Sequence, residues 1–408
     1  MLAATRQLVR WLDELGQISD EEARLTRTFL SPAMRRANAQ VGRWMQSAGL
    51  AVREDGVGNL IGRLEGPTPG AKTLLLGSHL DTVRDAGRFD GPLGVLLPIL
   101  ALQELQRRRI ALPYAVEVLG FAEEEGVRFA SAYLGSKGYS GQLRAADLAF
   151  KDAAGVSVRA ALETFAGAPW KAPAAAHRQS NLLGYFEVHI EQGPVLEAEE
   201  LAVGVVTAIA GQTRGRLTLR GRAGHAGTTP MALRRDALAG AAEVVLAAEA
   251  LARAVPGLVA TVGTLQVKPG APNVIPGEVV LSLDVRHARD GARTKALREL
   301  LATAGRIARR RRLGQEWQIT QDNGAVACAP ALTRQLGAAV RAVQGRNLEL
   351  VSGAGHDAVV MAGLTDVAML FVRCKEGLSH HPDEQAAPAD LDAALRVTVE
   401  FLSQLRHV

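Results

Sequence analysis

Apolar and polar residues follow two patterns in the first part of the chain, first helical spacing and then short apolar runs that alternate with helices. From Ala3 to about Leu50 the apolar residues recur at helical spacing, which predicts helices with one buried face. Short apolar runs at Leu74–His79 and Ala115–Phe121 then predict strands, and Gly94–Arg107 predicts the helix between them. This β-α-β order is typical of an α/β domain, in which helices flank a mixed or parallel central sheet. The core positions expected in the N-terminal helices are Trp11, Leu12, Leu15, Val41, Trp44 and Met45.

The pattern changes near Gly211, where a short segment alternates strictly between polar and apolar residues. A long alanine-rich helix is expected after it, followed by two further strands and a second helix. The expected elements are a strand at Arg216–Arg220, a helix at about Arg234–Val255, strands at Leu258–Val267 and Glu278–Arg286, and a helix at about Ala292–Arg310. The order β-α-β-β-α predicts a small two-layer α/β sandwich.

The last part of the chain returns to the alternation of strands and helices seen in the first part. Tyr185–Ile190 predicts a strand, Val351–Val372 alternates apolar runs with glycine-rich turns, and Ala387–Leu405 predicts a closing amphipathic helix. The segment Val156–Gln179, rich in alanine and proline, is expected to be a surface excursion. A chain of 408 residues also exceeds the usual size of a single core. We therefore predict a discontinuous domain of residues 1–210 and 324–408, interrupted by an inserted domain of residues 211–323.

Composition indicates a protein of the cytoplasm. The two cysteines, Cys328 and Cys374, suggest no disulfide framework and fit a reducing compartment. No apolar run reaches about 18 residues, so we expect no membrane span. The segment Met1–Gly16 carries charges within its apolar pattern, which predicts an amphipathic helix rather than a signal peptide.

Two arginine runs account for much of the formal net charge of +5. Runs such as Arg107–Arg109 and Arg309–Arg312 can contact nucleic acid, and salt-sensitive binding to polyanions would reveal that role. However, aromatic residues make up only 4% of the chain, and no stacking platform for bases is evident. We therefore interpret both runs as solvated helix faces and expect no nucleic-acid partner.

Side chains able to hold a metal follow the first predicted strand. His79 ends that strand, and Asp90 lies in a turn that glycines flank. Ligands of open α/β sheets bind at strand ends, so His79 and Asp90 are well placed to hold a metal. Asp81 is expected to hydrogen-bond the free ring nitrogen of His79 and so to fix its tautomer. Taken alone, His79 is better explained as a buried structural histidine than as a ligand, so the hypothesis depends on the residues downstream.

Further candidates follow the other predicted strands. Glu123–Glu125 come after the second strand, and their adjacent carboxylates repel each other unless a cation or solvent compensates. His189 and His380 complete a nitrogen and oxygen ligand set that suits Zn²⁺, Mn²⁺, Co²⁺ or Ni²⁺. In this hypothesis Asp90 bridges two ions, with His79 and His189 on one side and Glu125 and His380 on the other.

These motifs together resemble the M20 metallopeptidase-like superfamily, and within it the amidase/hydantoinase/carbamoylase branch. The resemblance implies two divalent metal ions, with Glu124 as general base and Glu125 as ligand. The family pattern Ser-His-x-Pro-x-Glu selects His380 as the ligand in place of the neighbouring His381. The motifs are His79-Leu80-Asp81, Asp90-Gly91, Glu124-Glu125-Gly126, His189-Ile190-Glu191-Gln192-Gly193, Gly224-His225-Ala226-Gly227 and Ser379-His380.

The inserted domain carries three further polar candidates. His225 lies in a turn that glycines flank, where it can stabilise an oxyanion, and Asn273 is held between prolines. Arg286 ends an alternating strand and on its own reads as part of a surface salt bridge. The resemblance implies instead that all three contact the substrate across a dimer interface, and therefore that a homodimer forms through residues 211–323. Weaker candidates for the lining of the substrate pocket are Gln192, Gly355 and His356. His356 is equally explained as a structural residue.

Enzymes of this branch hydrolyse ureido and carbamoyl groups attached next to a carboxylate. The stretches Asp81–Asp90 and Leu25–Ala33 resemble those of allantoate amidohydrolases, so allantoate is the expected substrate. N-carbamoyl-L-amino acids are the alternative, followed by ureidoglycolate and β-ureidopropionate. An M20 aminopeptidase or aminoacylase would use the same metals, whereas a binding protein on this fold would be expected to lack the base or a ligand.

Overall fold

The computed structural model describes residues 3–171, 177 and 179–405, and the chain divides into two compact units. Unit 1 comprises Met1–Thr207 and Cys328–Val408, and unit 2 comprises Ala208–Ala327. The boundaries therefore fall a few residues from the expected positions 210 and 324. None of the described helices is long and apolar enough to cross a membrane.

Unit 1 is built on a mixed sheet whose central strands are parallel. Neighbouring strands pair in parallel from β4 to β16, whereas β1, β2 and β6 run antiparallel to their neighbours. In spatial order the strands are β1 (Ala51–Glu54), β2 (Leu60–Leu64), β4 (Ala115–Phe121), β3 (Thr73–His79), β5 (Leu182–Ile190), β16 (Val367–Val372), β6 (Val203–Ile209) and β14 (Val326–Ala327), with β15 (Glu349–Ser352) paired to β6. The mixed central sheet predicted from the sequence is thus confirmed.

The four parallel strands are largely buried, and most of their residues are apolar. All seven residues of β3 and all seven of β4 are buried, as expected for strands covered on both faces. Helix α3 (Pro92–Arg107) connects β3 to β4 and packs against both, which completes the predicted β-α-β unit. Because β4, β3, β5 and β16 run in the same direction, their carboxyl ends meet at one edge of the sheet.

Helices pack around this sheet and bury their apolar faces. The N-terminal helices α1 (Ala3–Gly16) and α2 (Pro32–Ser47) meet through stacked rings of Trp11 and Trp44, whose centroids lie 4.7 Å apart. All six core positions predicted in these helices are buried. The remaining helical elements of unit 1 are α4 (Leu134–Tyr139), η1 (Asp147–Ala149), α5 (Val158–Ala166), η2 (Gln179–Asn181), α6 (Val195–Ala198), α9 (Pro330–Gln344), α10 (Ala358–Met361), η4 (Lys375–Gly377) and α11 (Pro388–Gln404).

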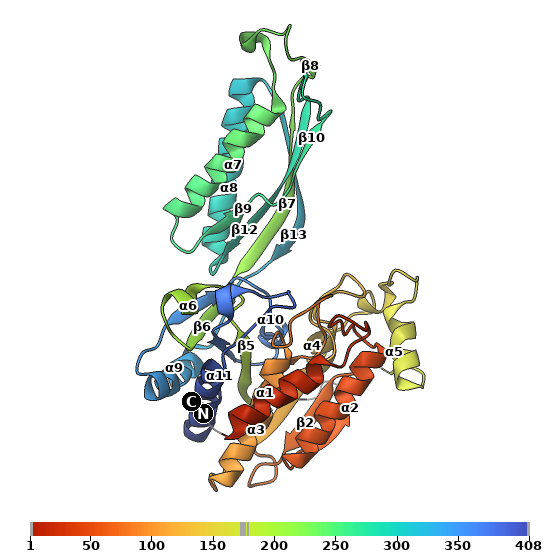
Figure 1. Cartoon of the computed structure of the whole chain (residues 1–408), viewed down its shortest axis with the longest axis vertical. Coiled ribbons are helices and arrows are strands. Elements are labelled where there is room, and N and C mark those ends of the chain that lie inside the picture. The colour runs from red at the N-terminus through yellow and green to blue at the C-terminus, as the bar shows by residue number, and fades with distance from the viewer. Residues whose placement is uncertain (1–2, 172–176, 178, 406–408) are drawn as a thin grey trace. The chain divides into compact units, whose positions relative to one another are not determined.

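Unit 2 is a two-layer sandwich, and Figure 1 shows helices α7 and α8 side by side on one face of its sheet. Strand β12 alternates strictly between partly exposed and buried residues, which is the pattern of a sheet covered on one face only. The sheet has the order β10 (Leu265–Lys268), β12 (Glu278–His287), β7 (Gly211–Arg220), β13 (Gly314–Asn323), with β9 (Val259–Thr261) beside β12; the other elements are α7 (Ala237–Ala254), α8 (Asp290–Arg311), η3 (Met231–Leu233) and the pair β8 (Gly224–His225) and β11 (Val274–Ile275).

Three local predictions were wrong or incomplete. The expected strand Leu258–Val267 is two strands, because β9 and β10 pair with different segments of β12. Strand β13 was missed, since it is a mostly exposed edge strand without alternating apolar residues. The expected excursion Val156–Gln179 contains helix α5, which buries Leu162 and Phe165, and part of it lies outside the described residues.

The arginine runs are engaged in ion pairs on helix surfaces. Arg107 and Arg108 both lie 2.7 Å from the carboxylate of Glu104 in α3. Arg310 and Arg311 likewise pair with Glu243 of α7. These contacts agree with the interpretation of the runs as helix faces, because neighbouring carboxylates already neutralise part of their charge.

Candidate functional site

The edge of the sheet where the parallel strands end carries the predicted ligands. His79 is the last residue of β3, His189 lies near the end of β5, and Glu125 follows β4 by a short turn. His380 is carried by the loop that leaves β16. The polar residues at the ends of strands that are far apart in the sequence therefore lie close together, because these strands run in the same direction.

Asp90 lies at the centre of this cluster, which we call the ligand cluster (His79, Asp90, Glu125, His189 and His380). Its Oδ1 is 3.4 Å from His79 Nε2 and 3.1 Å from His189 Nε2. Its Oδ2 is 3.3 Å from His380 Nε2, which is in turn 3.7 Å from Glu125 Oε1. The two oxygens of Asp90 therefore face two separate groups of side chains, one with His79 and His189 and the other with His380 and Glu125.

The two buried histidines are oriented by backbone carbonyls. His79 Nδ1 is 3.0 Å from the carbonyl oxygen of Asp81, and His189 Nδ1 is 2.9 Å from that of Ile190. Since a carbonyl only accepts, each Nδ1 carries a proton, and loss of the Nε2 proton, which cation binding would require, leaves a lone pair directed toward Asp90. This is the tautomer that a metal ligand needs.

The expected contact between Asp81 and the free ring nitrogen of His79 is present, and the backbone carbonyl of Asp81 makes it. Its carbonyl, not its carboxylate, makes the close contact to the His79 ring, and the nearest carboxylate oxygen is 3.4 Å away. The carboxylate instead accepts hydrogen bonds from the backbone amides of Glu124 (3.0 Å) and Glu125 (3.2 Å). Asp81 therefore connects the strand end that carries His79 to the turn that carries both glutamates.

The two histidines at the loop after β16 face different ways. His380 points at Asp90 and Glu125, and its backbone adopts a positive φ of 56°. The exposed His381 lies 3.7 Å from Asp383 and takes no part in the cluster. The geometry therefore favours His380 as the ligand, as the motif did.

The electrostatics of the cluster fit a divalent cation. Burial opposes the charge of Asp90, but the charge of His189 and hydrogen bonds from three histidines lower its pKa well below the ordinary value. Burial, and next the charge of Asp90, raise the pKa of Glu125 to about 7. Closely spaced, desolvated carboxylates and imidazole lone pairs are the donors that Zn²⁺ and Mn²⁺ accept. The residues present thus fit the predicted metal site.

Glu124 lies beside the cluster and also lines the cavity in front of it. Burial raises the pKa of Glu124 well above its usual range, although the charge of His79 partly opposes this. A carboxylate with increased proton affinity next to a metal site is suited to act as a general base. Glu123 has a structural role, since its buried carboxylate accepts from the backbone amides of Gly126 and Leu134.

The cavity at the cluster has a volume of about 190 Å³. This is less than the roughly 300–1,000 Å³ typical of sites for drug-sized ligands, so it suits a small substrate. Gln192 reaches into the cluster and donates to Asp90 Oδ2 at 2.8 Å, while its buried Oε1 has no hydrogen-bond partner among the described residues. Besides the ligand cluster, Glu124 and Gln192, the cavity is lined by Ala132, Tyr133, Ala354 and Gly355.

His356 does not line this cavity, which corrects its assignment to the substrate site. It is buried, and its Nε2 lies 2.7 Å from Ser352 Oγ. Its ring packs edge-on against that of His189, with centroids 4.5 Å apart. Burial, and next the charge of His189, lower the pKa of His356 well below its ordinary value. His356 is therefore a neutral packing residue behind a ligand.

The close approach of Gly91 to His79 gives a testable prediction. A methyl group at Gly91 would lie 2.4 Å from Cε1 and 2.7 Å from Nε2 of the His79 ring. We expect Gly91→Ala to displace that ring and to lower both metal content and turnover by at least about tenfold. The measurement is metal content by mass spectrometry beside turnover.

The matched control for this variant is Gly70→Ala. Gly70 has nearly the same φ (78° against 81°), but nothing lies within 4 Å of the added methyl. Both variants therefore place an alanine at a positive φ, but only Gly91→Ala brings the added methyl against a ligand. Equal metal contents in the two proteins would show that the approach of Gly91 to His79 does not matter.

Two residues of the His380 loop also hold Asp90 in place. Glu384 is buried and accepts from the backbone amides of Phe89 (2.9 Å) and Asp90 (3.1 Å). Ser379 Oγ lies 2.8 Å from Asp90 Oδ2 and 2.9 Å from Glu384 Oε2. The sequence motif contained both residues, but only the structure shows that they connect the loop to the bridging carboxylate.

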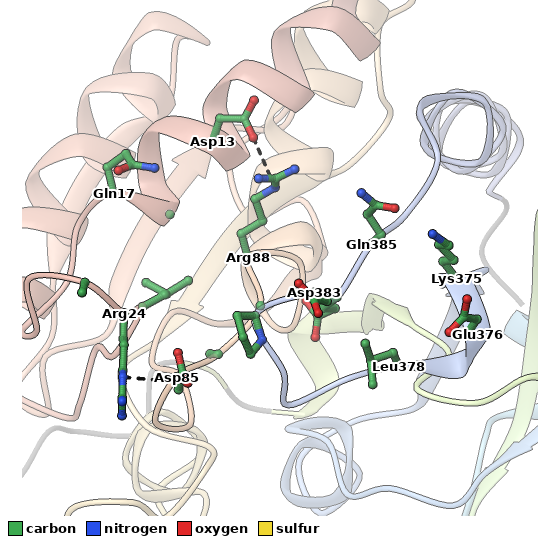
Figure 2. Close-up of a pocket in the computed structure, with 17 residues that line it drawn as sticks. Asp13, Gln17, Arg24, Asp85, Arg88, Lys375, Glu376, Leu378, Asp383 and Gln385 are labelled. Atoms are coloured by element: carbon green, nitrogen blue, oxygen red, sulfur yellow. Dashed lines mark ion pairs between the residues drawn. The ribbon is translucent and has the colours of Figure 1, made fainter.

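A larger cavity of about 540 Å³ lies behind this loop, and Figure 2 shows the side chains around it. Its charged residues are partly paired, Asp13 with Arg88 at 3.2 Å and Arg24 with Asp85 at 4.0 Å. None of the cavity's described lining residues is a histidine, and only Glu384 among them contacts Asp90. The smaller cavity is therefore the better candidate for catalysis.

The candidates in unit 2 are arranged at its two ends. His225 and Asn273 are neighbours, because β8 pairs with β11 and the amide of Ala226 donates to the carbonyl of Asn273 at 2.9 Å. The exposed His225 accepts at Nδ1 from the amides of Gly227 (3.0 Å) and Thr228 (3.2 Å). Its Nε2 therefore carries the proton and is available as a donor to an oxyanion.

Arg286 belongs to the opposite end of β12. It pairs with Asp284 at 2.8 Å and lies opposite Gln212 in the sheet. Glu278 begins the strand, shortly after Asn273, and the eight residues from there to Arg286 span about 26 Å at ~3.3 Å per residue. One insert therefore does not present Arg286 to the same small substrate as His225 and Asn273.

Comparison with known proteins gives consistent findings. A sequence profile described as peptidase family M20/M25/M40 matches residues 75–404. The allantoate deiminase of Arabidopsis thaliana is 40% identical over 97% of this chain and 81% of its own length, and an N-carbamoyl-L-amino-acid amidohydrolase of Pseudomonas sp. (strain NS671) is 38% identical over 98% and 97%. A crystal structure of an amidase of the hydantoinase/carbamoylase family from Burkholderia multivorans is 34% identical, with a TM-score of 0.92 over 98% of this chain and 97% of that one.

Proposed function

Because the chain belongs to peptidase family M20/M25/M40, we propose that it hydrolyses the ureido group of a small carboxylate, with allantoate as its substrate. The family inferred from the motifs is confirmed, and the chain is a hydrolase of C–N bonds. The observation that carries the proposal is the position of Glu124 beside the ligand cluster, in a cavity of substrate size.

Two divalent cations would be held by the ligand cluster, with Asp90 between them. When bound, they would lower the pKa of a water molecule and polarise the substrate carbonyl. His79 and His189 face one oxygen of Asp90, and His380 faces the other with Glu125 beside it. Mn²⁺ and Zn²⁺ suit this donor set, and Co²⁺ and Ni²⁺ are alternatives.

The proton transfers are assigned to Glu124. It accepts a proton from the attacking water and delivers it to the nitrogen that leaves with the substrate skeleton. The bond between the ureido carbon and that nitrogen breaks, and the carbamate that forms decomposes to ammonia and carbon dioxide. The carboxylate of Asp81 keeps Glu124 in position by accepting a hydrogen bond from the backbone amide of Glu124.

The residues of unit 2 are proposed to complete the site in a homodimer. His225 would donate to the oxyanion through Nε2, Asn273 beside it would contact the substrate, and Arg286 would bind the substrate carboxylate with its guanidinium fork. Since one insert cannot offer both ends of β12 to the same small molecule, we propose that His225 and Asn273 come from the partner subunit. This arrangement makes dimerisation a requirement for turnover.

The relatives do not decide the substrate, since deiminase and carbamoylase are almost equally similar to this chain. Allantoate is favoured by the stretches Asp81–Asp90 and Leu25–Ala33, and N-carbamoyl-L-amino acids are the alternative. The discriminating experiment supplies the purified protein with Mn²⁺ or Zn²⁺ and measures ammonia release from allantoate, ureidoglycolate, N-carbamoyl-β-alanine and several N-carbamoyl-L-amino acids.

We expect kcat/KM to be highest for allantoate and turnover to disappear when a chelator removes the metal. Restored activity after readdition of one cation would identify the ion that the site prefers. A higher kcat/KM for an N-carbamoyl-L-amino acid would replace allantoate by the alternative. Release of ammonia from none of these compounds would contradict the proposed reaction itself.

A further inference from the structure

One polar group in the cavity is used neither by the fold nor by the proposed mechanism. The hydroxyl of Tyr133, a residue that lines the cavity with Glu124, has no hydrogen-bond partner among the described residues. Burial, and next the charge of Glu124, raise the pKa of Tyr133 well above its ordinary value, so the hydroxyl stays protonated. It can therefore both donate and accept a hydrogen bond.

The backbone fixes Tyr133 relative to the base. Its amide donates to the carbonyl of Glu124 at 3.3 Å, and the next residue, Leu134, donates to the carboxylate of Glu123 at 3.2 Å. Tyr133 adopts a left-handed conformation with φ of 69°, which is unfavourable for a residue with a side chain. Such strain persists where the surrounding structure enforces it and is concentrated at functional sites.

Gly355, which also lines the cavity, leaves room for this hydroxyl because it carries no side chain. A methyl group at Gly355 would lie 1.9 Å from Tyr133 Oη and 3.9 Å from Glu124 Oε1. The hydroxyl and the carboxylate thus both approach the same point of the wall, and any side chain there would displace the hydroxyl. This gives the glycine-rich turn of Gly353–Asp357 a role that its sequence does not reveal.

We propose that Tyr133 is a specificity-determining residue, whose hydroxyl accepts a hydrogen bond from the terminal amino group of the substrate's ureido function. The inference rests on the proposed function and deepens it. A ureido group differs from an acyl group by carrying NH₂ where an N-acetyl compound carries CH₃. A polar atom placed beside the reacting carbon can discriminate between these two, because only the NH₂ group can donate to it.

The test measures binding directly, in a background that cannot turn over the ligand. Isothermal calorimetry on metal-loaded Glu124→Gln would give the Kd of N-carbamoylglycine and of N-acetylglycine, which differ only at this group. We expect the parent to prefer the carbamoyl compound, and Tyr133→Phe to weaken that compound alone by about tenfold. Equal loss for both ligands, no loss for either, or no preference in the parent would overturn the inference.

Two further variants separate a specific contact from general damage. Tyr114→Phe also removes a buried tyrosine hydroxyl, which donates to the carbonyl of Leu402 at 2.6 Å, and it should leave the ligand preference unchanged. Gly355→Ala should reproduce the loss of preference, and its binding defect should be smaller when Tyr133→Phe is already present. Strictly additive defects in the double variant would contradict the contact.

The wild-type substrate panel keeps this inference separate from the proposed function. If the wild type releases ammonia from ureido compounds but Tyr133→Phe keeps the preference, only the role of Tyr133 is wrong. If no ureido compound is hydrolysed, the proposed function fails, and the role of Tyr133 fails with it.

Discussion

Glu124→Gln is expected to abolish most turnover and to leave the metal content unchanged. The amide has nearly the same shape as the carboxylate but cannot accept a proton, and a general base contributes about 10²–10⁴-fold to a rate. The backbone amide of residue 124 still donates to Asp81, so the turn should keep its geometry. The measurements are kcat and metal content on the same preparation.

Glu125→Gln is the matched comparison, since it makes the same chemical change one residue away. Glu125 belongs to the group with Asp90 and His380, so its loss should lower both metal content and turnover. The two variants therefore differ in metal content while both are slow. If Glu124→Gln loses metal and Glu125→Gln keeps it, the two roles are reversed.

The ligand cluster could be predicted because the relevant physics is local to each strand. Buried strands such as β3 and β4 are continuous apolar runs, so their ends are visible in the sequence, and β4 has the predicted bounds. Once the strands are parallel, their carboxyl ends share one edge of the sheet, and the polar residues that follow must lie close together. The pairing of His79 with His189 also requires β3 and β5 to be neighbours in the sheet, an order that the sequence did not predict.

The features that were missed depend on contacts between distant segments. His356 has the residue type of a ligand, yet it lies behind His189 and is held by Ser352, which no spacing reveals. The position of Tyr133 depends on a positive φ and on the absence of a side chain at Gly355. Edge strand β13 lacks the alternation that a buried face imposes, because its outer side has no neighbour in the sheet.

In the inserted unit, the resemblance alone does not show which of the three substrate candidates can reach the same substrate molecule. The motifs assigned His225, Asn273 and Arg286 to the substrate as one group. The register of β12 separates them, since Arg286 lies opposite Gln212 whereas Glu278, at the other end, lies opposite Arg220. In the proposed homodimer these roles would be divided between the two inserts, which can be tested by mixing inactive subunits.

His225→Ala and Glu124→Gln are each expected to be nearly inactive alone and to recover activity when their subunits are exchanged. In a mixed dimer, the His225→Ala subunit keeps its own Glu124 and receives His225 from its partner, so one of the two sites is intact. Random exchange between symmetric dimers would then restore about a quarter of wild-type turnover. The measurement is ammonia release after subunits are mixed, partially unfolded and refolded together.

Arg286→Ala provides the matched control, because the length of β12 predicts the opposite outcome for it. If Arg286 serves the site of its own subunit, the Arg286→Ala subunit stays defective in every mixed dimer, and mixing with Glu124→Gln restores nothing. Recovery in both mixtures would require one insert to reach the same substrate with both of its ends, which the span of about 26 Å does not allow. Recovery in neither would place His225 in the site of its own subunit and remove the need for a dimer.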